Sequence, residues 1–260
     1  MSAAATMLIA ILLPNALMIG CGGGNGGSGG MSTTQSPTVS TTAAQNGAVI
    51  VSLASATSGA AIYYTADGST PSSSSQQYQA PFLVASNLTL RAIAMAASMA
   101  NSTVTSQSFT PNIPSGTLVW SDEFANSTGA AAQPDPKFWT YDTGNSGFGN
   151  HELETYCAWG SSASPCSTAN PSAFVGTDGY LHIVAQQPSD GVYTSARLKT
   201  QGLFSFQYGR FEVRAQVPEA QGFWPAGWLL GNNITDLALA SPLPGMLLTP
   251  MIIAKTIFFQ

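Results

Sequence analysis

Two tryptophans have the residue type and spacing to contact a sugar. Trp224 and Trp228 stand four residues apart in the segment GFWPAGWLLG. A sugar ring presents an apolar C–H face, and the flat indole of a tryptophan is a suitable partner for it. The alternative is that both belong to a hydrophobic core, since tryptophan is commonly buried at least in part. Both side chains are therefore candidates for saccharide contacts, with core packing as the competing interpretation.

The carboxylates that cleavage of a sugar chain would need are missing from the same region. A glycosidase that works through two carboxyl groups needs one acid and one nucleophile or base facing each other across the bond. After Asp236 the sequence contains no Asp or Glu, and residues 237–260 carry a single charge, Lys255. Glu123, in the segment WSDEF, is one of the twelve Asp and Glu residues that the chain carries up to Asp236. The last 24 residues therefore supply no such pair.

The composition favours β-strands and loops and argues against nucleic acid as a partner. Only 7% of the 260 residues are charged, against roughly 25% in an ordinary soluble domain. Ser, Thr, Ala, Gly and Asn replace the charges, which suits exposed strands and loops better than helices. The net charge is −5 and no run of Lys or Arg occurs, so binding to nucleic acid is not expected. A neutral polysaccharide would not require a charged surface.

Residues 1–21 read as a targeting segment. An apolar stretch with the length of a signal h-region ends in Leu-Met-Ile-Gly before Cys21, and residues 22–36 form a linker rich in Gly, Ser and Thr. This arrangement resembles a bacterial lipoprotein processing site. The resemblance implies that Cys21 carries the lipid and that the chain is exported and tethered to a bacterial membrane, at the outer surface or the periplasmic face. An ordinary membrane anchor and a misplaced start codon are the alternatives.

Two further cysteines flank a short loop. If Cys21 takes the lipid, Cys157 and Cys166 remain, with eight residues between them. A disulfide across a surface loop fits an oxidising compartment, and two free thiols are the alternative. Neither cysteine has a second ligand at zinc-type spacing, so no metal site is expected there.

Residues 37–110 carry the pattern of a small β-sandwich. Runs at 49–53, 61–65 and 88–94 are rich in strand-forming residues, and Asp67-Gly68 is a strong turn signal. The stretch IYYTADGSTP followed by TLRAIA resembles the Ig-like C-terminal domain of chitobiases and β-hexosaminidases. Such modules are accessory domains, and the resemblance implies a spacer in preference to a carbohydrate-binding platform. A stiffer linker follows at 111–117.

Residues 118–236 contain five segments in a fixed order. They are WSDEF from Trp120, GNHELE from Gly149, SAR from Ser195, YGRFEVR from Tyr208 and GFWPAGWLLG from Gly222. Together they resemble the N-terminal half of glycoside hydrolase family 16, the laminarinase-like β-glucanases. The resemblance implies a β-jelly-roll of two curved antiparallel sheets that appears truncated here. The local patterns agree: 204–217 alternates as a strand, Asp178-Gly179 introduces another at 180–185, and no helix of ordinary length is expected.

The resemblance also implies roles for single residues. Arg197 and Asn150 stand where the family contacts sugar hydroxyls, and Trp224 and Trp228 are expected to line the cleft. Glu123 would help to hold a structural calcium ion through oxygen ligands. In the family, catalysis depends on a following E-x-D-x-x-E strand, whose first and last glutamates are nucleophile and acid/base in a retaining mechanism. This motif is absent from the sequence, so no catalytic residue is assigned.

Three interpretations of residues 237–260 compete. A membrane helix is interrupted by prolines and Lys255 before any run reaches about 18 apolar residues. A divergent strand would leave hydrophobic edges open. An out-of-frame ending is favoured, because suitable codons for Leu-Ala-Leu-Ala-Ser at 237–241 would, one base on, encode Trp-Pro-Trp-Pro-Ala, which resembles the family's loop at that point.

Two functions of different class follow. The first is a surface-tethered, retaining endo-β-1,3-glucanase-like hydrolase of which this chain is an incomplete copy. The second is a non-catalytic, surface-anchored protein or remnant that binds β-glucan weakly through Trp224 and Trp228.

Overall fold

The computed structural model describes residues 31–149, 151–219 and 222–232, together with the backbone of 248–256. The chain divides into two compact units, Met1–Met31 and Ser32–Gln260, and every described element lies in the second. These elements are strands apart from two short 3₁₀ turns, η1 (Gln45–Gly47) and η2 (Gly147–Gly149). The expectation of an all-β fold without ordinary helices is confirmed for the part of the chain that the structure describes.

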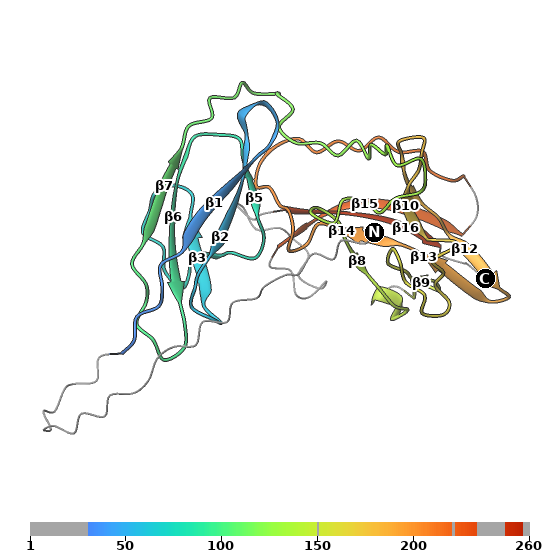
Figure 1. Ribbon diagram of the computed structural model, residues 1–260, viewed down its shortest axis with the longest axis horizontal. Helices are drawn as coiled ribbons and strands as arrows, with labels where there is room; N and C mark the ends of the chain where they lie inside the picture. Colours follow the sequence, from blue (N-terminus) through green and yellow to red (C-terminus); the bar gives the residue numbers. More distant parts are fainter. Residues whose placement is uncertain (1–30, 150, 220–221, 233–247, 257–260) are drawn as a thin grey trace, which may run out of the picture. The chain divides into compact units, whose positions relative to one another are not determined.

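The first half of the larger unit is a small sandwich of two antiparallel sheets (Figure 1). Its strands are β1 (Thr38–Ala43), β2 (Val49–Ala54), β3 (Ala61–Thr65), β4 (Gln76–Gln77), β5 (Phe82–Val84), β6 (Leu88–Met95) and β7 (Thr105–Phe109). One sheet has the order β1-β2-β5 and the other the order β4-β3-β6-β7. The three runs expected to be strands, at 49–53, 61–65 and 88–94, lie in β2, β3 and β6.

Alternation along these strands builds the core of the small sandwich. Val51 and Leu53 of β2 turn inwards and pack in one cluster with Tyr64 of β3 and Leu90 of β6. The ring of Tyr64 stacks on that of Phe82, with centroids 5.1 Å apart and planes only 5° from parallel. Burial raises the pKa of Tyr64 well above its usual value. The period of two in the sequence therefore determines which face of each sheet is apolar.

The DGSTP segment is a turn stabilised by its own side chains. Oδ1 of Asp67 accepts hydrogen bonds from the backbone N–H of Ser69 at 2.9 Å and from its hydroxyl at 2.6 Å. These bonds hold the pKa of Asp67 below its usual range. Nη1 of Arg91, in β6, donates to the carbonyl of Gly68 at 3.3 Å and to the hydroxyl of Thr70 at 3.0 Å. The turn that follows β3 is thereby tied to β6.

The second half of the unit contains three further sheets. Its strands are β8 (Thr140–Asp142), β9 (Thr155–Tyr156), β10 (Ala173–Val175), β11 (Leu181–Ile183), β12 (Gln186–Ser189), β13 (Val192–Ser195), β14 (Arg197–Lys199), β15 (Phe223–Gly231) and β16 (Leu248–Thr256). The sheet orders are β10-β11, β12-β13-β9 and β15-β16-β14-β8. β10 and β11 pair antiparallel around the turn at Asp178-Gly179, as the sequence predicted.

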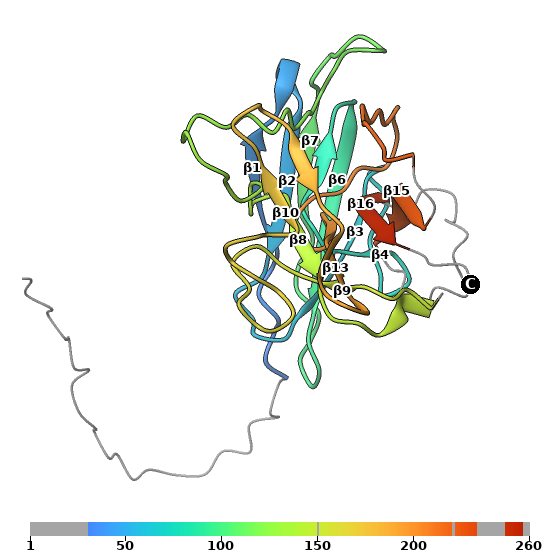
Figure 2. The same ribbon diagram turned by 90° about the vertical axis from the view of Figure 1, so that its right-hand side faces the viewer.

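β16 takes an interior position in the four-stranded sheet. It pairs antiparallel with β15 along all nine residues of that strand and with β14 on its other side. Both views show β15 and β16 side by side (Figures 1 and 2). Of the three interpretations of the C-terminal residues, the backbone of 248–256 adopts the strand; 237–247 and 257–260 lie outside the described residues. None of the described segments forms a helix with the length and apolar character needed to cross a membrane.

The prediction of a strand at 204–217 is wrong. Within it, Ser205 makes an isolated parallel bridge to Phe82, and residues 211–219 belong to no strand. Phe204 and Phe206 are buried, whereas 212–219 are exposed. Alternation shows which side chains can share a face, but a strand also needs a neighbour for its backbone hydrogen bonds. Here the backbone partner is confined to the bridge at Ser205, and the rest of the segment has none among the described strands.

Candidate functional site

Arg197 lies at the centre of a buried cluster of charged groups. It belongs to β14, and only 4% of its surface is exposed. Its Nε donates a hydrogen bond of 3.0 Å to Oδ2 of Asp142, its cross-strand partner in β8. Nη1 of Arg197 lies 3.8 Å from Oε1 of Glu152, and Lys199 forms a second ion pair with Asp142. Removing a guanidinium from water is costly unless it is paired, so these carboxylates fix its position.

Two aromatic rings enclose the guanidinium of Arg197. Its Cζ lies 4.8 Å from the ring centroid of Phe148 and 5.3 Å from that of Trp228. A cation over an aromatic face is attracted by the ring quadrupole, by about 1 kcal/mol or more when water is excluded. Phe148 belongs to η2 and has a positive φ of 43°. The cluster therefore holds the half-buried indole of Trp228 against a fixed charge.

Tyr156 joins two glutamates next to Arg197. Its hydroxyl oxygen lies 2.6 Å from Oε2 of Glu152 and 2.9 Å from Oε1 of Glu154. All three side chains are buried. Burial, followed by hydrogen bonding and charge from both glutamates, raises the pKa of Tyr156, so its hydroxyl stays protonated. One phenolic proton is donated to one carboxylate at a time, and the hydroxyl therefore couples the two glutamates.

The two candidate tryptophans lie on one face of β15. Residues four apart in a strand point the same way and stand about 13 Å apart. Trp224 is 52% exposed, whereas Trp228 packs with Tyr156 and Phe148. In the backbone register, Ala226 pairs with a residue of β16 that itself pairs with Arg197. Along the strand direction, Arg197 therefore lies midway between Trp224 and Trp228. We call the face of β14 and β15 that carries these three residues the tryptophan face.

The structure brings together some of the residues expected from the sequence. Arg197 and Trp228 are in contact, and Trp224 shares their face. Trp228 is partly buried in the cluster, whereas Trp224 is exposed rather than part of a core; a sugar contact at either residue stays a prediction. Asn150 and Cys21 lie outside the described residues. Arg197 is almost fully buried, so its place here is beneath Trp228 rather than at the surface.

Sequence reasoning missed the partners of Arg197. Glu152, Glu154 and Tyr156 occupy alternate positions, a spacing of two that places side chains on one face of an extended segment. Leu153, between the two glutamates, is exposed. The alternation was a readable signal in the GNHELE segment. The position of Asp142 was not, because it depends on the pairing of β8 with β14, strands far apart in the chain.

Glu152 and Glu154 do not form a catalytic pair. A glycosidase carboxyl must reach the scissile bond. Glu154 has no exposed surface, and Glu152 is 5% exposed. Both converge on the hydroxyl of Tyr156. Their carboxylates serve to hold Tyr156 and Arg197.

Glu123 does not gather further ligands within the described residues. It is exposed, and the structure described here contains no group of three or more His, Cys, Asp or Glu side chains arranged to hold a metal. The neighbouring Asp122 is used structurally: its carboxylate accepts hydrogen bonds from the N–H of Phe124 at 2.9 Å and from Nε1 of Trp139 at 2.7 Å. A calcium ion at Glu123 stays a prediction.

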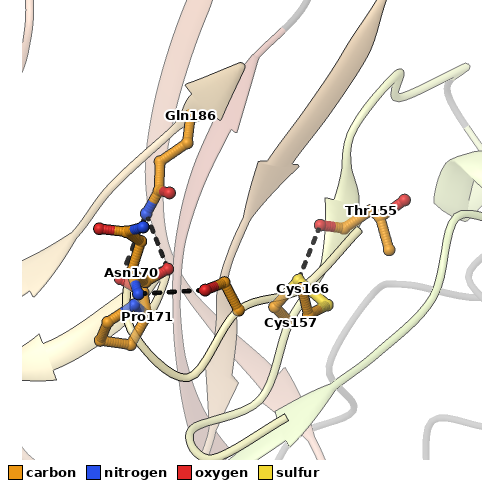
Figure 3. The surroundings of a disulfide bond; sticks show 7 residues. Thr155, Cys157, Cys166, Asn170, Pro171 and Gln186 are labelled. Atoms are coloured by element: carbon orange, nitrogen blue, oxygen red, sulfur yellow. Dashed lines mark hydrogen bonds between the residues drawn. A yellow bond between two sulfur atoms is a disulfide. The ribbon is translucent and has the colours of Figure 1, made fainter. Parts of the chain in front are cut away.

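A disulfide lies next to Tyr156 in the chain. Cys157 follows Tyr156 and is bonded to Cys166 across the loop that the two cysteines flank. Figure 3 shows the disulfide beside the carbonyl of Thr155, with the side chain of Gln186 donating to the carbonyls of Asn170 and Pro171 nearby. The N–H of Cys157 also donates to the carbonyl of Ser195, at 2.9 Å. The strand that carries Tyr156 is therefore anchored by a covalent and a hydrogen-bonded contact.

Comparison with known proteins agrees with both parts of the chain. Residues 40–106 match the chitobiase/beta-hexosaminidase C-terminal domain family. Over 124 residues the chain is 44% identical to a beta-glucanase of Rhodothermus marinus, a stretch that covers 47% of this chain and 38% of that protein. A beta-1,3-glucan-binding protein of Penaeus monodon is 55% identical over 40 residues, which cover 15% of this chain and 11% of that one.

A solved laminarinase structure from Rhodothermus marinus is 41% identical, covering 48% of this chain and 45% of that chain, with a TM-score of 0.37. The chain thus spans less than half the length of each of these relatives. Over roughly half of its own length the chain is homologous in sequence to β-glucanases, which confirms the resemblance drawn from the five sequence segments.

Proposed function

We propose that the chain recognises β-1,3-glucan on the tryptophan face. The observation that carries this proposal is that Trp228 is held by the buried Arg197 cluster while Trp224 is exposed on the same strand face. An exposed indole can stack on the C–H face of a sugar ring, and a preformed aromatic surface loses little entropy on binding. The similarity to a beta-glucanase and to a beta-1,3-glucan-binding protein supports glucan as the ligand.

The chain as written is proposed to bind glucan without cleaving it. Its lineage is that of a retaining endo-β-1,3-glucanase, whose mechanism needs two accessible carboxyl groups. The sequence has no E-x-D-x-x-E motif, and the two glutamates near Arg197 are buried. Hydrolysis by this chain is the competing function, favoured by the 44% identity to a beta-glucanase.

Binding and cleavage assays with laminarin, a β-1,3-glucan, distinguish these two functions. Affinity electrophoresis in laminarin gels should retard the purified chain, and Trp224→Ala should weaken binding about tenfold, because truncating an anchoring tryptophan costs about 1.4 kcal/mol or more. Tyr208→Ala is the matched control, since Tyr208 is an exposed aromatic residue outside β15; its affinity should stay unchanged. No reducing sugar should be released.

Two outcomes would contradict the proposal. If Trp224→Ala and the unsubstituted chain are retarded equally in laminarin gels, the tryptophan face is not the binding surface. Release of reducing ends from laminarin by chain of this length would show that other residues supply the catalytic carboxyls.

The export route is proposed to be that of a lipoprotein. A small residue before Cys21, after an apolar segment and before a Gly- and Ser-rich tether, supports lipidation at Cys21 and a location on the outer surface or the periplasmic face of a bacterial membrane. Incorporation of a labelled fatty acid at Cys21 tests this assignment.

Residues 237–260 are proposed to be read from a shifted frame. The support is the Trp-Pro-Trp-Pro-Ala reading available one base on from 237–241. The strand pairing of β16 does not decide this, because an apolar segment can pair as a strand in either case. Resequencing the coding DNA beyond codon 236 tests it: a shifted frame that encodes E-x-D-x-x-E supports the proposal, and its absence contradicts it.

A further inference from the structure

The sheet β1-β2-β5 of the small sandwich has two apolar faces. Its inner face, with Val51 and Val84, belongs to the sandwich core. The neighbouring positions Ile50 and Leu83 point to the opposite face, because adjacent residues of a strand alternate. Ile50 is nevertheless buried, with 8% of its surface exposed. Something outside the small sandwich therefore covers this outer face.

The covering residues come from the glucanase-like half of the chain. Ile50 forms one buried cluster with Phe204 and Phe206, and Leu83 packs against it. Trp120, Phe138 and Leu229 complete the cluster from the second half. The ring of Trp120 stacks on that of Phe204, with centroids 4.4 Å apart. An apolar core is thus shared by the two halves of the Ser32–Gln260 unit.

Hydrogen bonds fix the register of this contact. The N–H of Leu83 donates to the carbonyl of Ser205 at 2.9 Å, and the hydroxyl of Ser205 donates to the carbonyl of Pro81 at 3.0 Å. Ser205 has no exposed surface. The segment around Ser205 therefore uses β5 as its backbone partner, which explains how it remains ordered outside any strand of its own.

A second set of bonds secures the chain where it leaves the linker. The N–H of Gln45 donates to the carbonyl of Val119 at 3.1 Å, and its side-chain amide donates to the hydroxyl of Ser121 at 2.9 Å. Nδ2 of Asn46 donates to the carbonyl of Leu118 at 2.8 Å. These contacts from η1 hold the first residues after the linker against the small sandwich.

We infer that the small sandwich is a docked structural support of the glucanase-like half and that the two unfold as one cooperative unit. Domains joined by a linker move relative to each other unless the interface is substantial and hydrophobic. Here the interface contains a shared buried core and backbone hydrogen bonds. This role replaces the spacer favoured from the sequence, and it does not depend on whether the tryptophan face binds glucan.

The distribution of tryptophans makes the coupling measurable. All five tryptophans lie after the linker, from Trp120 onward, so the tryptophan signal comes from the glucanase-like half, including Trp120 in the contact itself. Leu83→Asp places a carboxylate in the contact without touching the sandwich core. The thermal midpoint reported by tryptophan should fall by at least about 5 °C, because an unpaired charge is expensive to bury. Leu83→Ala should give a smaller shift of the same sign.

Ser106→Asp is the matched control. Ser106 is an exposed position of β7 in the same sandwich, so the same charge there should move the tryptophan midpoint by no more than about 1 °C. Near-ultraviolet circular dichroism at low temperature verifies that each variant is folded before heating. If Leu83→Asp and Leu83→Ala both leave the tryptophan midpoint where Ser106→Asp does, the two halves unfold independently and the inference is overturned.

Discussion

At the residue scale, the hydroxyl of Tyr156 is the group on which the buried cluster depends. It is the hydrogen-bond partner that Glu152 and Glu154 share, and Glu152 in turn lies beside Arg197. A buried carboxylate that loses a donor retains its desolvation cost without compensation. The same oxygen thus supports the charge that positions Trp228.

Tyr156→Phe should destabilise the fold while leaving the ring in place. The free energy of unfolding should fall by about 1–3 kcal/mol, because a buried carboxylate loses the hydrogen bond that this hydroxyl donates. Urea denaturation followed by tryptophan fluorescence measures this loss. Tyr180→Phe removes a hydroxyl from an exposed ring and should change stability by less than about 0.5 kcal/mol. Equal midpoints for the two variants would show that the cluster does not depend on the hydroxyl.

How well each site residue could be predicted depends on whether its sequence pattern is local or requires strands that are far apart in the chain. Trp224 and Trp228 are recognisable from residue type and from a spacing within one strand. The alternation of Glu152 and Glu154 is equally local. The pairing of Arg197 with Asp142 arises only when β8 and β14 become neighbours, and no pattern within either short strand specifies that pairing.

At the element scale, strands of the small sandwich were predictable and one segment of the second half was not. β2, β3 and β6 alternate and have strand partners in their own sandwich. The 204–217 segment alternates equally well, but the part around Ser205 bonds to β5 and the rest is exposed. Local periodicity describes one strand, whereas a sheet requires a second strand whose position is set by the whole fold.

The disulfide beside β9 should stabilise the element that carries Tyr156. Cys157 and Cys166 are nine positions apart, and closing a loop of that length contributes about 2–3 kcal/mol by restricting the unfolded chain. The Cys157→Ser/Cys166→Ser variant should lose that amount in urea denaturation. A reducing agent supplies the control: it should lower the stability of the unsubstituted chain to that of the variant and leave the variant unchanged. A variant as stable as the oxidised chain would contradict the prediction.

At the scale of the whole molecule, composition, the disulfide and the proposed lipoprotein signal are consistent with one environment outside the cytosol. The chain carries few charges, contains a disulfide and is similar to glucan-acting proteins. A disulfide persists in oxidising compartments outside the cytosol. A glucan polymer is too large to reach a protein inside the cell, so a protein that recognises it benefits from a position at the cell surface. Residues 22–36 provide the tether that such a position would need.

Cys21→Ser should release the protein from the membrane if the lipid is its anchor. Each buried CH₂ of an acyl chain contributes about 0.8 kcal/mol, and stable anchoring needs two chains or one chain with a second signal. After expression in a lipoprotein-processing bacterium, the unsubstituted chain should partition into the detergent phase of a Triton X-114 extract. The Cys21→Ser chain should shift to the aqueous phase by about tenfold or more, whereas Ser28→Ala, in the tether, should partition as the unsubstituted chain does.

Detergent partitioning of the Cys21→Ser chain would instead favour an anchor formed by the apolar segment itself, and aqueous partitioning of both chains would favour the misplaced start codon. Because the tryptophan face is formed by β14 and β15 and not by residues 22–36, laminarin binding should be the same in the soluble and anchored forms.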